Sequence, residues 1–149
     1  AQSTSLEIQY EGFVSVSESS DDFAGLPDRR WLRIAGLRST RQDGSPLCWS
    51  EVMVPERFAP DRAEVRKGAR AIYEIVLQQH GLKLDYVEQT ITATHLPPQY
   101  ADVLLATANS PALLVRRRYV AHAGASFEIS HNMYPADRFS IQSIIRQRA

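Results

Sequence analysis

The chain has 149 residues, a length that suits one domain able to bury most of its apolar surface. Its hydrophobic content of 44%, charged content of 23% and formal net charge of zero argue against a surface built to bind nucleic-acid phosphates. The single cysteine, Cys48, excludes an internal disulfide and a Cys-x-x-Cys zinc site. No apolar run is long enough to span a membrane and no leader pattern opens the sequence, so we expect a cytoplasmic protein.

The first third of the chain predicts a linker, a strand and a hairpin. Ala1–Ser5 is polar and lacks an initial methionine, which we interpret as a linker remnant at 1–5 before a domain at 6–149. Leu6–Ser17 alternates loosely between apolar and polar residues, as a strand does. Trp31–Arg41 and Leu47–Val54 also alternate, and the Asp43-Gly44 pair between them is typical of a hairpin turn.

The middle of the chain predicts two helices and a long strand. Glu64–His80 carries apolar residues at helical spacing, and Gly81 follows where a C-terminal cap belongs. Leu82–His95 alternates valine, isoleucine and alanine with threonine and glutamate, which favours a strand. A short helix is expected over residues 97–108, because proline suits the first turn of a helix.

The last third repeats the earlier hairpin. Pro111–Ala121 and Ala125–Tyr134 alternate in the same way, and Ser140–Arg146 is expected to close the sheet as a further strand. A shift of eighty residues brings identical residues together at Arg38/Arg118, Gly44/Gly124, Ser50/Ser130, Met53/Met133 and Pro55/Pro135. We therefore predict an α+β domain, with duplicated hairpins in one mainly antiparallel sheet, flanking helices, and a ligand cleft between the halves.

The last hairpin strand presents two different faces under the period-two rule of strands. One row is apolar apart from a histidine: Phe127, Ile129, His131 and Met133. The other row holds an acid, a hydroxyl, an amide and a phenol: Glu128, Ser130, Asn132 and Tyr134. This polar row suits a small polar ligand, and it equally suits a solvated sheet face.

Arginines and histidines are the other residues that could carry chemistry. Arg38 and Arg118 occupy equivalent places in the two hairpins, and an arginine inside an apolar strand needs an internal carboxylate or an anionic ligand. The four histidines have no metal-ligand spacing, and no catalytic triad, phosphate loop or dinucleotide motif is present. The sequence therefore predicts no metal, no cofactor and no familiar enzyme machinery.

Eight short segments, in order, resemble the UTRA domain, the effector-binding domain of GntR-type transcriptional regulators of the HutC subfamily. They are Leu37-Arg38, Asp43-Gly44-Ser45-Pro46-Leu47, Ala71-Ile72-Tyr73, His80-Gly81, Ser110-Pro111-Ala112-Leu113, Arg116–Tyr119, Phe127-Glu128-Ile129-Ser130 and Tyr134-Pro135-Ala136-Asp137-Arg138-Phe139. The likeness runs from about Leu6 to Arg146, and it implies a chorismate-lyase-like fold.

The resemblance implies a non-enzymatic, homodimeric ligand sensor that controls a winged-helix DNA-binding domain lying before it. Family ligand contacts fall on Arg38, Tyr73, Glu128 and Tyr134, to which the strand pattern adds Ser130 and the repeat adds Arg118. DNA contact is expected only through the separate N-terminal domain, and no membrane contact is expected.

Two departures from the phosphosugar-binding members bear on the ligand. Arg38 is followed by Ser39 and Thr40 where those members resemble Arg-x-Arg, and Ala71 stands where they carry serine before Tyr73. Both changes remove phosphate-binding groups, which favours a carboxylate as the anionic part of the effector. Two alternatives remain: a chorismate-lyase-like enzyme acting on a small carboxylate, and a dimerisation module with an empty cleft.

Overall fold

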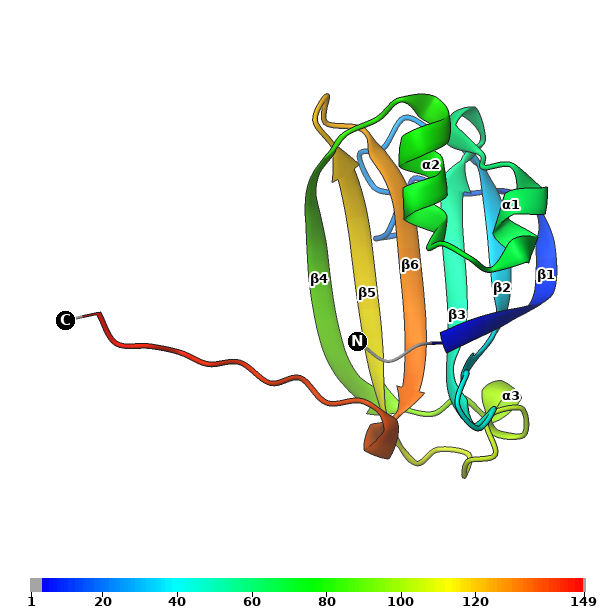
Figure 1. Ribbon diagram of the computed structural model, residues 1–149, viewed down its shortest axis with the longest axis vertical. Coiled ribbons are helices and arrows are strands. Elements are labelled where there is room, and N and C mark those ends of the chain that lie inside the picture. Colours follow the sequence, from blue (N-terminus) through cyan, green and yellow to red (C-terminus); the bar gives the residue numbers. More distant parts are fainter. Residues whose placement is uncertain (1–3, 149) are drawn as a thin grey trace.

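The computed structural model describes residues 4–148, which fold around one six-stranded antiparallel sheet of order β1-β2-β3-β6-β5-β4 (Figure 1). The strands are β1 (Thr4–Ser15), β2 (Arg30–Thr40), β3 (Pro46–Pro55), β4 (Leu84–His95), β5 (Pro111–Ala121) and β6 (Ser126–Pro135). The helices are α1 (Arg62–Lys67), α2 (Ile72–His80) and α3 (Pro98–Ala101), with single turns of 3-10 helix at η1 (Glu56–Phe58) and η2 (Ala136–Arg138). The predicted α+β class and mainly antiparallel sheet are confirmed.

The duplication is confirmed and is larger than the two hairpins. The sheet order places β1, β2 and β3 in one half and β4, β5 and β6 in reversed order in the other. At the eighty-residue shift β4 matches β1 and η2 matches η1, so each half consists of three strands and a helical turn. In the centre of the sheet Glu51 of β3 pairs with its own counterpart, His131 of β6. A local two-fold axis therefore passes between these two residues.

Both hairpin turns use a glycine in the left-handed backbone region. Gly44 has φ of 72° and Gly124 has φ of 89°, and each lies between the paired strands of its hairpin. Only residues without a Cβ adopt this region at low cost, so the glycines direct both turns as predicted. The second turn, residues 122–125, is one residue shorter than the first, residues 41–45.

The helix predicted over Glu64–His80 is wrong as a single element. Gly68 ends α1 with φ of 67°, and α2 begins at Ile72. The left-handed glycine turns the chain, so residues 68–71 form an irregular segment between the helices. Gly81, with φ of 62°, caps α2 as predicted.

The main apolar core lies between the sheet and the two helices. Its fully or nearly fully buried side chains include Leu32, Ile34, Val54, Val65, Ile75, Val76 and Phe127. Burying such a side chain contributes roughly 1.5–3 kcal/mol, so this layer is a major source of stability. Figure 1 shows α1 and α2 covering one face of the sheet near one end of the strands, which leaves the other end of that face free of helix.

The side chain of Phe127 lies on the same face of the sheet as Glu128 and packs into this core. The prediction that these two side chains point to different faces is therefore wrong. The β5–β6 register changes between Tyr119, paired with Glu128, and Val120, paired with Ser126. Phe127 is thus the extra residue of a β-bulge, and a bulge lets two successive side chains share a face. The first hairpin has the same irregularity at Leu47, the residue that matches Phe127 at the eighty-residue shift.

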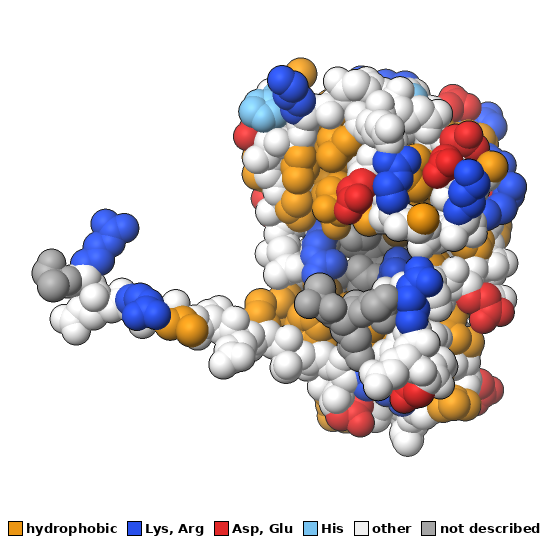
Figure 2. All heavy atoms as spheres, viewed as in Figure 1, with side chains coloured by type: hydrophobic (Ala, Val, Ile, Leu, Met, Phe, Trp, Pro, Cys, Tyr) orange, Lys and Arg blue, Asp and Glu red, His pale blue; other side chains and the backbone are white. Residues whose placement is uncertain are grey.

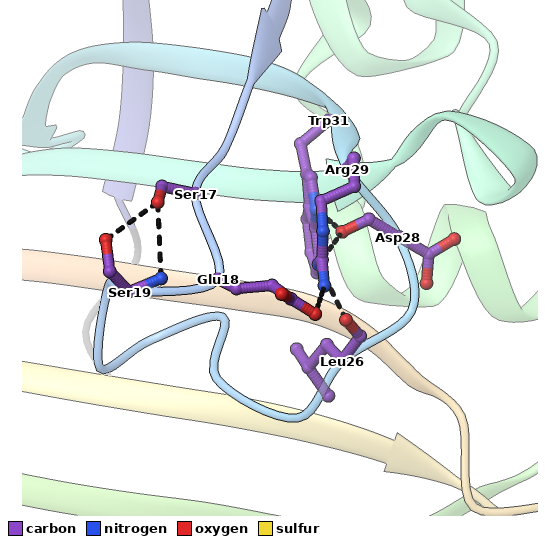
Figure 3. A network of polar contacts seen from close by, with 7 residues as sticks. All are labelled: Ser17, Glu18, Ser19, Leu26, Asp28, Arg29 and Trp31. Carbon is purple, nitrogen blue, oxygen red and sulfur yellow. Dashed lines mark hydrogen bonds and ion pairs between the residues drawn. The ribbon is translucent and has the colours of Figure 1, made fainter.

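The opposite face of the sheet is covered by the segment around α3, with Leu96 and Leu104, and by the loop at 16–29. Arg29 holds this loop by donating to the carbonyl of Asp28 (2.9 Å) and by pairing with the carboxylate of Glu18 (Figure 3). The indole of Trp31, which is fully buried, donates to the same carbonyl of Asp28 (3.1 Å). The loop therefore seals the apolar side chains beneath it from water.

The elements at the chain ends differ from prediction. β1 already begins at Thr4, whereas residues 1–3 of the expected linker lie outside the described residues. The predicted strand at Ser140–Arg146 is wrong: residues 140–148 form an exposed arm that extends away from the body (red in Figure 1). The helix expected over residues 97–108 shortens to α3. Within the described residues, no helix is long and apolar enough to cross a membrane.

Candidate ligand-binding cavity

A cavity of about 1300 Å³ opens on the helix-covered face of the sheet. Its floor is the polar row of β6 together with neighbouring residues of β3 and β5. Its walls come from the start of β1, the irregular segment 68–71 and residues 138–140. Arg41 joins two of these walls by donating to the carbonyls of Thr4 and Gly68, each at 2.9 Å. Figure 2 shows Lys and Arg side chains gathered on this face below α2.

The structure brings together five of the six expected site residues. Those that line the cavity are Arg38, Tyr73, Glu128, Ser130 and Tyr134. Their meeting follows from the strand period: Glu128, Ser130 and Tyr134 lie at even spacing on β6, and Arg38 of β2 lies on the same face of the sheet. Tyr73 reaches the site from the first turn of α2.

Arg118 lies on the other face of the sheet. It pairs directly with Ile129 in the β5–β6 register, donates to Ser126 Oγ at 2.9 Å and forms an ion pair with Glu88 at 3.4 Å. The shorter second turn shifts β5 by one residue relative to β2, so the sequence match between Arg38 and Arg118 is not a structural match. A shift of one residue moves a strand side chain to the opposite face.

In the strand register Tyr119 takes the place of Arg38, since it pairs with Glu128 as Arg38 pairs with Cys48. The arginine of the run that lines the cavity is Arg117. It is the β5 partner of Ser130, lines the cavity, and donates from Nε to Gln89 Oε1 at 2.7 Å. Asn132 and Tyr119 complete this side of the site and were also absent from the expected set. The strand pattern placed Asn132 in the polar row, but only the register between β5 and β6 shows which arginine of the run faces that row.

Glu128 is the one acid among the described residues that line the cavity, and it is buried, with 3% of its surface exposed. Burial raises the pKa of this carboxyl to about 8, although Arg38 and Arg117 both act to lower it. Its Oε1 atom has no hydrogen-bond partner among the described residues. At neutral pH the group is therefore mostly a neutral acid with unused hydrogen-bonding capacity.

Arg38 and Arg117 have no acidic partner in the described part of the chain. Arg38 donates to Thr4 Oγ1 at 3.0 Å and to Ser50 Oγ at 3.4 Å, which are neutral groups. Among the described residues neither guanidinium has a carboxylate within 4.0 Å, whereas Arg116 on the opposite face is paired with Asp22 at 2.5 Å. Arg38 and Arg117 therefore carry positive charge that no described carboxylate neutralises.

The floor between these arginines is polar and uncharged. Ser50 Oγ donates to Asn132 Oδ1 at 2.5 Å, and the Cys48 thiol lies 3.6 Å from the same hydroxyl. Burial raises the pKa of the Cys48 thiol and raises the pKa of Tyr134 to about 12, so both remain protonated near neutral pH. Uncharged donors and acceptors of this kind orient a ligand without competing for the arginines.

Two aromatic rings and the start of α2 in the cavity wall also suit an anionic ligand. The rings of Tyr73 and Tyr119 stack with centroids 4.9 Å apart beside Glu128, which gives the cavity a flat apolar side. Among the described residues no side chain caps the N-terminus of α2 at Ala71, so the partial positive charge of that helix end faces the cavity wall. No group of three acidic, histidine or cysteine side chains suited to a metal occurs in the described part of the chain.

Several solved protein structures have a fold similar to that of this chain. A GntR-family transcriptional regulator from Bacillus cereus is 17% identical and superposes with a TM-score of 0.79, covering 96% of this chain and 99% of that one. The effector domain of PhnF from Mycobacterium smegmatis is 18% identical, with a TM-score of 0.81 over 97% of this chain and 88% of that one. In the longer PhnF structure, with a TM-score of 0.80 at 18% identity, the match covers 98% of this chain and 64% of that one.

No curated protein matches the sequence. At these identities the structural likeness shows a shared α+β fold, the chorismate-lyase-like arrangement that we expected, and leaves function to be argued from the site. The UTRA domain family matches residues 25–140, a segment that holds most of the cavity, including Arg38, Arg117 and Glu128. This chain therefore belongs to the UTRA domain family.

Proposed function

We propose that this domain binds a small anionic effector in the cavity and serves as the sensor of a GntR-type regulator of the HutC subfamily. In this proposal the domain works in the cytoplasm as a homodimer and controls a separate N-terminal winged-helix domain that contacts DNA. Membership in the UTRA family and the likeness in fold to GntR-family regulators support the regulatory part. The cavity supports the ligand part.

The observation that carries the proposal is the unneutralised pair of Arg38 and Arg117 on either side of a neutral Glu128. Buried or half-buried arginines are stable when a carboxylate or phosphate neutralises them, and this cavity supplies no such group. A ligand carboxylate would form charge-assisted hydrogen bonds worth roughly 1.5–3 kcal/mol each. The absence of a serine at Ala71 and of a second arginine after Arg38 makes a carboxylate fit better than a phosphate.

Glu128 adds a requirement on the rest of the ligand. Its unpartnered Oε1 accepts a hydrogen bond, and its protonated form also donates one. Ser130 and Asn132 on the same row supply further neutral groups. The effector is thus expected to carry at least one hydroxyl, amide or amine beside its anionic group.

The regulatory mechanism follows from differential affinity. A ligand shifts a conformational equilibrium only by the difference in its binding free energy to the two states. Residues 138–140 and 68–71 both line the cavity and lie outside the regular strands and helices, apart from Arg138 at the end of η2. These segments are the parts of the wall that can adapt to a ligand without breaking the sheet.

One observation favours a second candidate, a chorismate-lyase-like enzyme acting on a small carboxylate. A glutamic acid with a pKa raised to about 8 beside two arginines is suited to proton transfer. The sensor proposal requires bound carboxylates to leave the cavity chemically unchanged. Mass spectrometry of each binding carboxylate after prolonged incubation distinguishes the two, since any product formed identifies the enzyme.

The experiment that tests the proposal is a thermal-shift screen of small carboxylates, each matched with its neutral amide. We expect stabilisation by one or more carboxylates and none by the amides. Arg38→Ala and Arg117→Ala should abolish the shift and keep the unliganded melting temperature close to that of the parent protein. Arg118→Ala, on the opposite face, is the matched control and should keep the shift. Equal shifts in all three variants would place the ligand elsewhere and refute the proposal.

A further inference from the structure

The cavity carries more positive charge than one carboxylate would neutralise. Among the described residues, five arginine side chains line it, against one acid, Glu128. Two of the five have a carboxylate partner outside the cavity lining. Arg70 pairs with Glu64 at 3.9 Å. Arg138 pairs with Asp137 at the same distance. These two arginines therefore do not depend on a ligand for a counter-ion.

The other three arginines differ in what they contact. Arg41 donates to the backbone carbonyls of Thr4 and Gly68, and so joins two walls of the cavity. Arg38 and Arg117 donate to neutral side chains, and no described carboxylate lies within 4.0 Å of either guanidinium group. Removing an arginine from water without a counter-ion is costly, so the cavity has at least two positive charges for a ligand to neutralise.

Arg38 and Arg117 are attached at opposite corners of the cavity floor. Arg38 comes from β2 and Arg117 from β5, and the sheet order places β3 and β6 between them. Neighbouring strands lie about 4.8 Å apart, so these two strands are separated by roughly 14 Å. In the register Arg117 is level with Ser130, Val52 and Ile34. Ile34 is four residues before Arg38, which adds an offset of roughly 13 Å along the strands.

Neighbouring side chains hold the two guanidinium groups toward opposite edges of the sheet. Arg38 donates from Nη1 to Thr4 Oγ1 on β1 at 3.0 Å, in addition to its long hydrogen bond with Ser50. Arg117 donates from Nε to Gln89 Oε1 on β4 at 2.7 Å. β1 and β4 are the two edge strands of the sheet. A guanidinium group has five N–H donors, so both arginines keep donors for a ligand, but one carboxylate cannot bind both.

The part of the floor between the two arginines suits a ligand segment that carries no charge. Ser50 of β3 donates to Asn132 of β6 there. The buried Oε1 atom of Glu128 has no hydrogen-bond partner among the described residues, and Glu128 lines the cavity. The stacked rings of Tyr73 and Tyr119 supply a flat apolar side. A short carbon chain with a polar substituent matches this surface.

We propose that the effector is a dicarboxylate, with one carboxylate bound by Arg38 and the other, several carbon atoms away, bound by Arg117. This inference rests on the proposed effector-binding function and adds the second anionic group. Two separate carboxylates neutralise both arginines through charge-assisted hydrogen bonds. A phosphomonoester carries its two charges on one group, so it leaves one of the two arginines without a counter-ion.

The first test compares ligands on the parent protein by isothermal titration calorimetry. The series is succinate, glutarate, adipate, pimelate and suberate, each with its half-amide, which keeps the shape and removes one charge. We expect the affinity to be highest at one chain length or at two neighbouring lengths, because the arginines are fixed on a rigid sheet. The half-amide of the best diacid should bind at least about tenfold more weakly, since it loses one charge-assisted contact.

Three outcomes of this series overturn the inference. The first is equal affinity of the best diacid and its half-amide, or no binding by any diacid. The second is tighter binding of glucose 6-phosphate than of every diacid, because that ligand presents both charges on a single group. The third is an affinity that rises steadily with chain length, which would indicate apolar contact alone.

The second test assigns the second carboxylate to Arg117. In Arg117→Gln the diacid and its half-amide should bind with nearly equal affinity, because Arg38 is then the one arginine of the pair that remains. Arg118→Gln, on the opposite face of the sheet, is the matched control and should keep the difference. Arg117→Glu should reverse the preference and bind 6-aminohexanoate more tightly than adipate. A difference that persists in Arg117→Gln overturns the assignment. The melting temperature of each unliganded variant checks its fold, and the ligand series on the parent protein needs no variant.

This inference and the proposed function fail separately. If hexanoate binds as tightly as adipate, and Arg38→Ala abolishes the binding of both, the anion sensor stands and the second carboxylate is wrong. If the diacids bind equally to the parent protein, to Arg38→Ala and to Arg117→Ala, the ligand lies elsewhere and both are wrong.

Discussion

The buried carboxyl of Glu128 predicts an unusual dependence of stability on pH. Its pKa is raised in the folded protein, so the folded state holds the proton more tightly than the unfolded state does. The stability that this group contributes is present below the unfolded pKa near 4.5 and is lost as pH rises toward the folded pKa of about 8. Glu128→Gln keeps the shape of the neutral acid and removes the titration.

The magnitude follows from the shift. Each unit of pKa difference corresponds to about 1.4 kcal/mol, so the parent protein should lose about 2 kcal/mol of unfolding free energy from this group between pH 6 and pH 8. For a domain of this size that loss corresponds to roughly 4–8 °C in Tm. The carboxyl is 3% exposed, so solvent screening does not reduce the effect greatly.

The assay is urea unfolding of the parent and Glu128→Gln at pH 6, 7 and 8 in ligand-free protein. Other groups titrate alike in both proteins, so the difference between the two profiles isolates Glu128. We expect the variant to gain stability relative to the parent as pH rises. Parallel profiles would show that the carboxyl is already ionised at pH 6, and would refute the neutral-acid description of the cavity.

Two further predictions concern the fold around the site. Phe127→Ala should lower the unfolding free energy by about 3–5 kcal/mol in urea unfolding, because this fully buried bulge residue fills the core; a cost below about 1 kcal/mol would contradict its placement. Gly36→Ala should cost about 1–3 kcal/mol or more, since a Cβ there would lie 2.0 Å from the backbone oxygen of Glu7. Gly12→Ala is its matched control and should be nearly neutral in the same urea unfolding, because the nearest atom, Tyr10 Oη at 3.1 Å, belongs to a movable side chain.

Much of the fold and part of the site were predictable because they depend on local periodicity. Alternation along β6 required Glu128, Ser130 and Tyr134 to share a face, and the turn glycines Gly44 and Gly124 located both hairpins. The eighty-residue repeat then required the two hairpins to be alike, which led to the duplicated antiparallel sheet. These inferences need only the geometry of a strand and of a turn.

The register between neighbouring strands, and with it the face on which each side chain lies, was decided by tertiary structure alone. Period two requires Arg117 to face away from Arg116 and Arg118, but it does not say which side is the cavity. That choice depends on the pairing of β5 with β6, which a turn one residue shorter and a bulge at Phe127 set together. The pKa of Glu128 is likewise a property of the assembled site, because it depends on burial by distant segments.

For the helices and the C-terminal arm, too, local sequence predicted the tendency of each segment and tertiary structure decided the outcome. Apolar spacing predicted helix over Glu64–His80, but the left-handed turn at Gly68 breaks it and provides a wall of the cavity. The β-forming composition of Ser140–Arg146 predicted a strand, yet no free edge of its own sheet receives that segment. Sequence determines what each segment tends to form, whereas register, burial and the available edges determine what it contacts, since those depend on residues far apart in the chain.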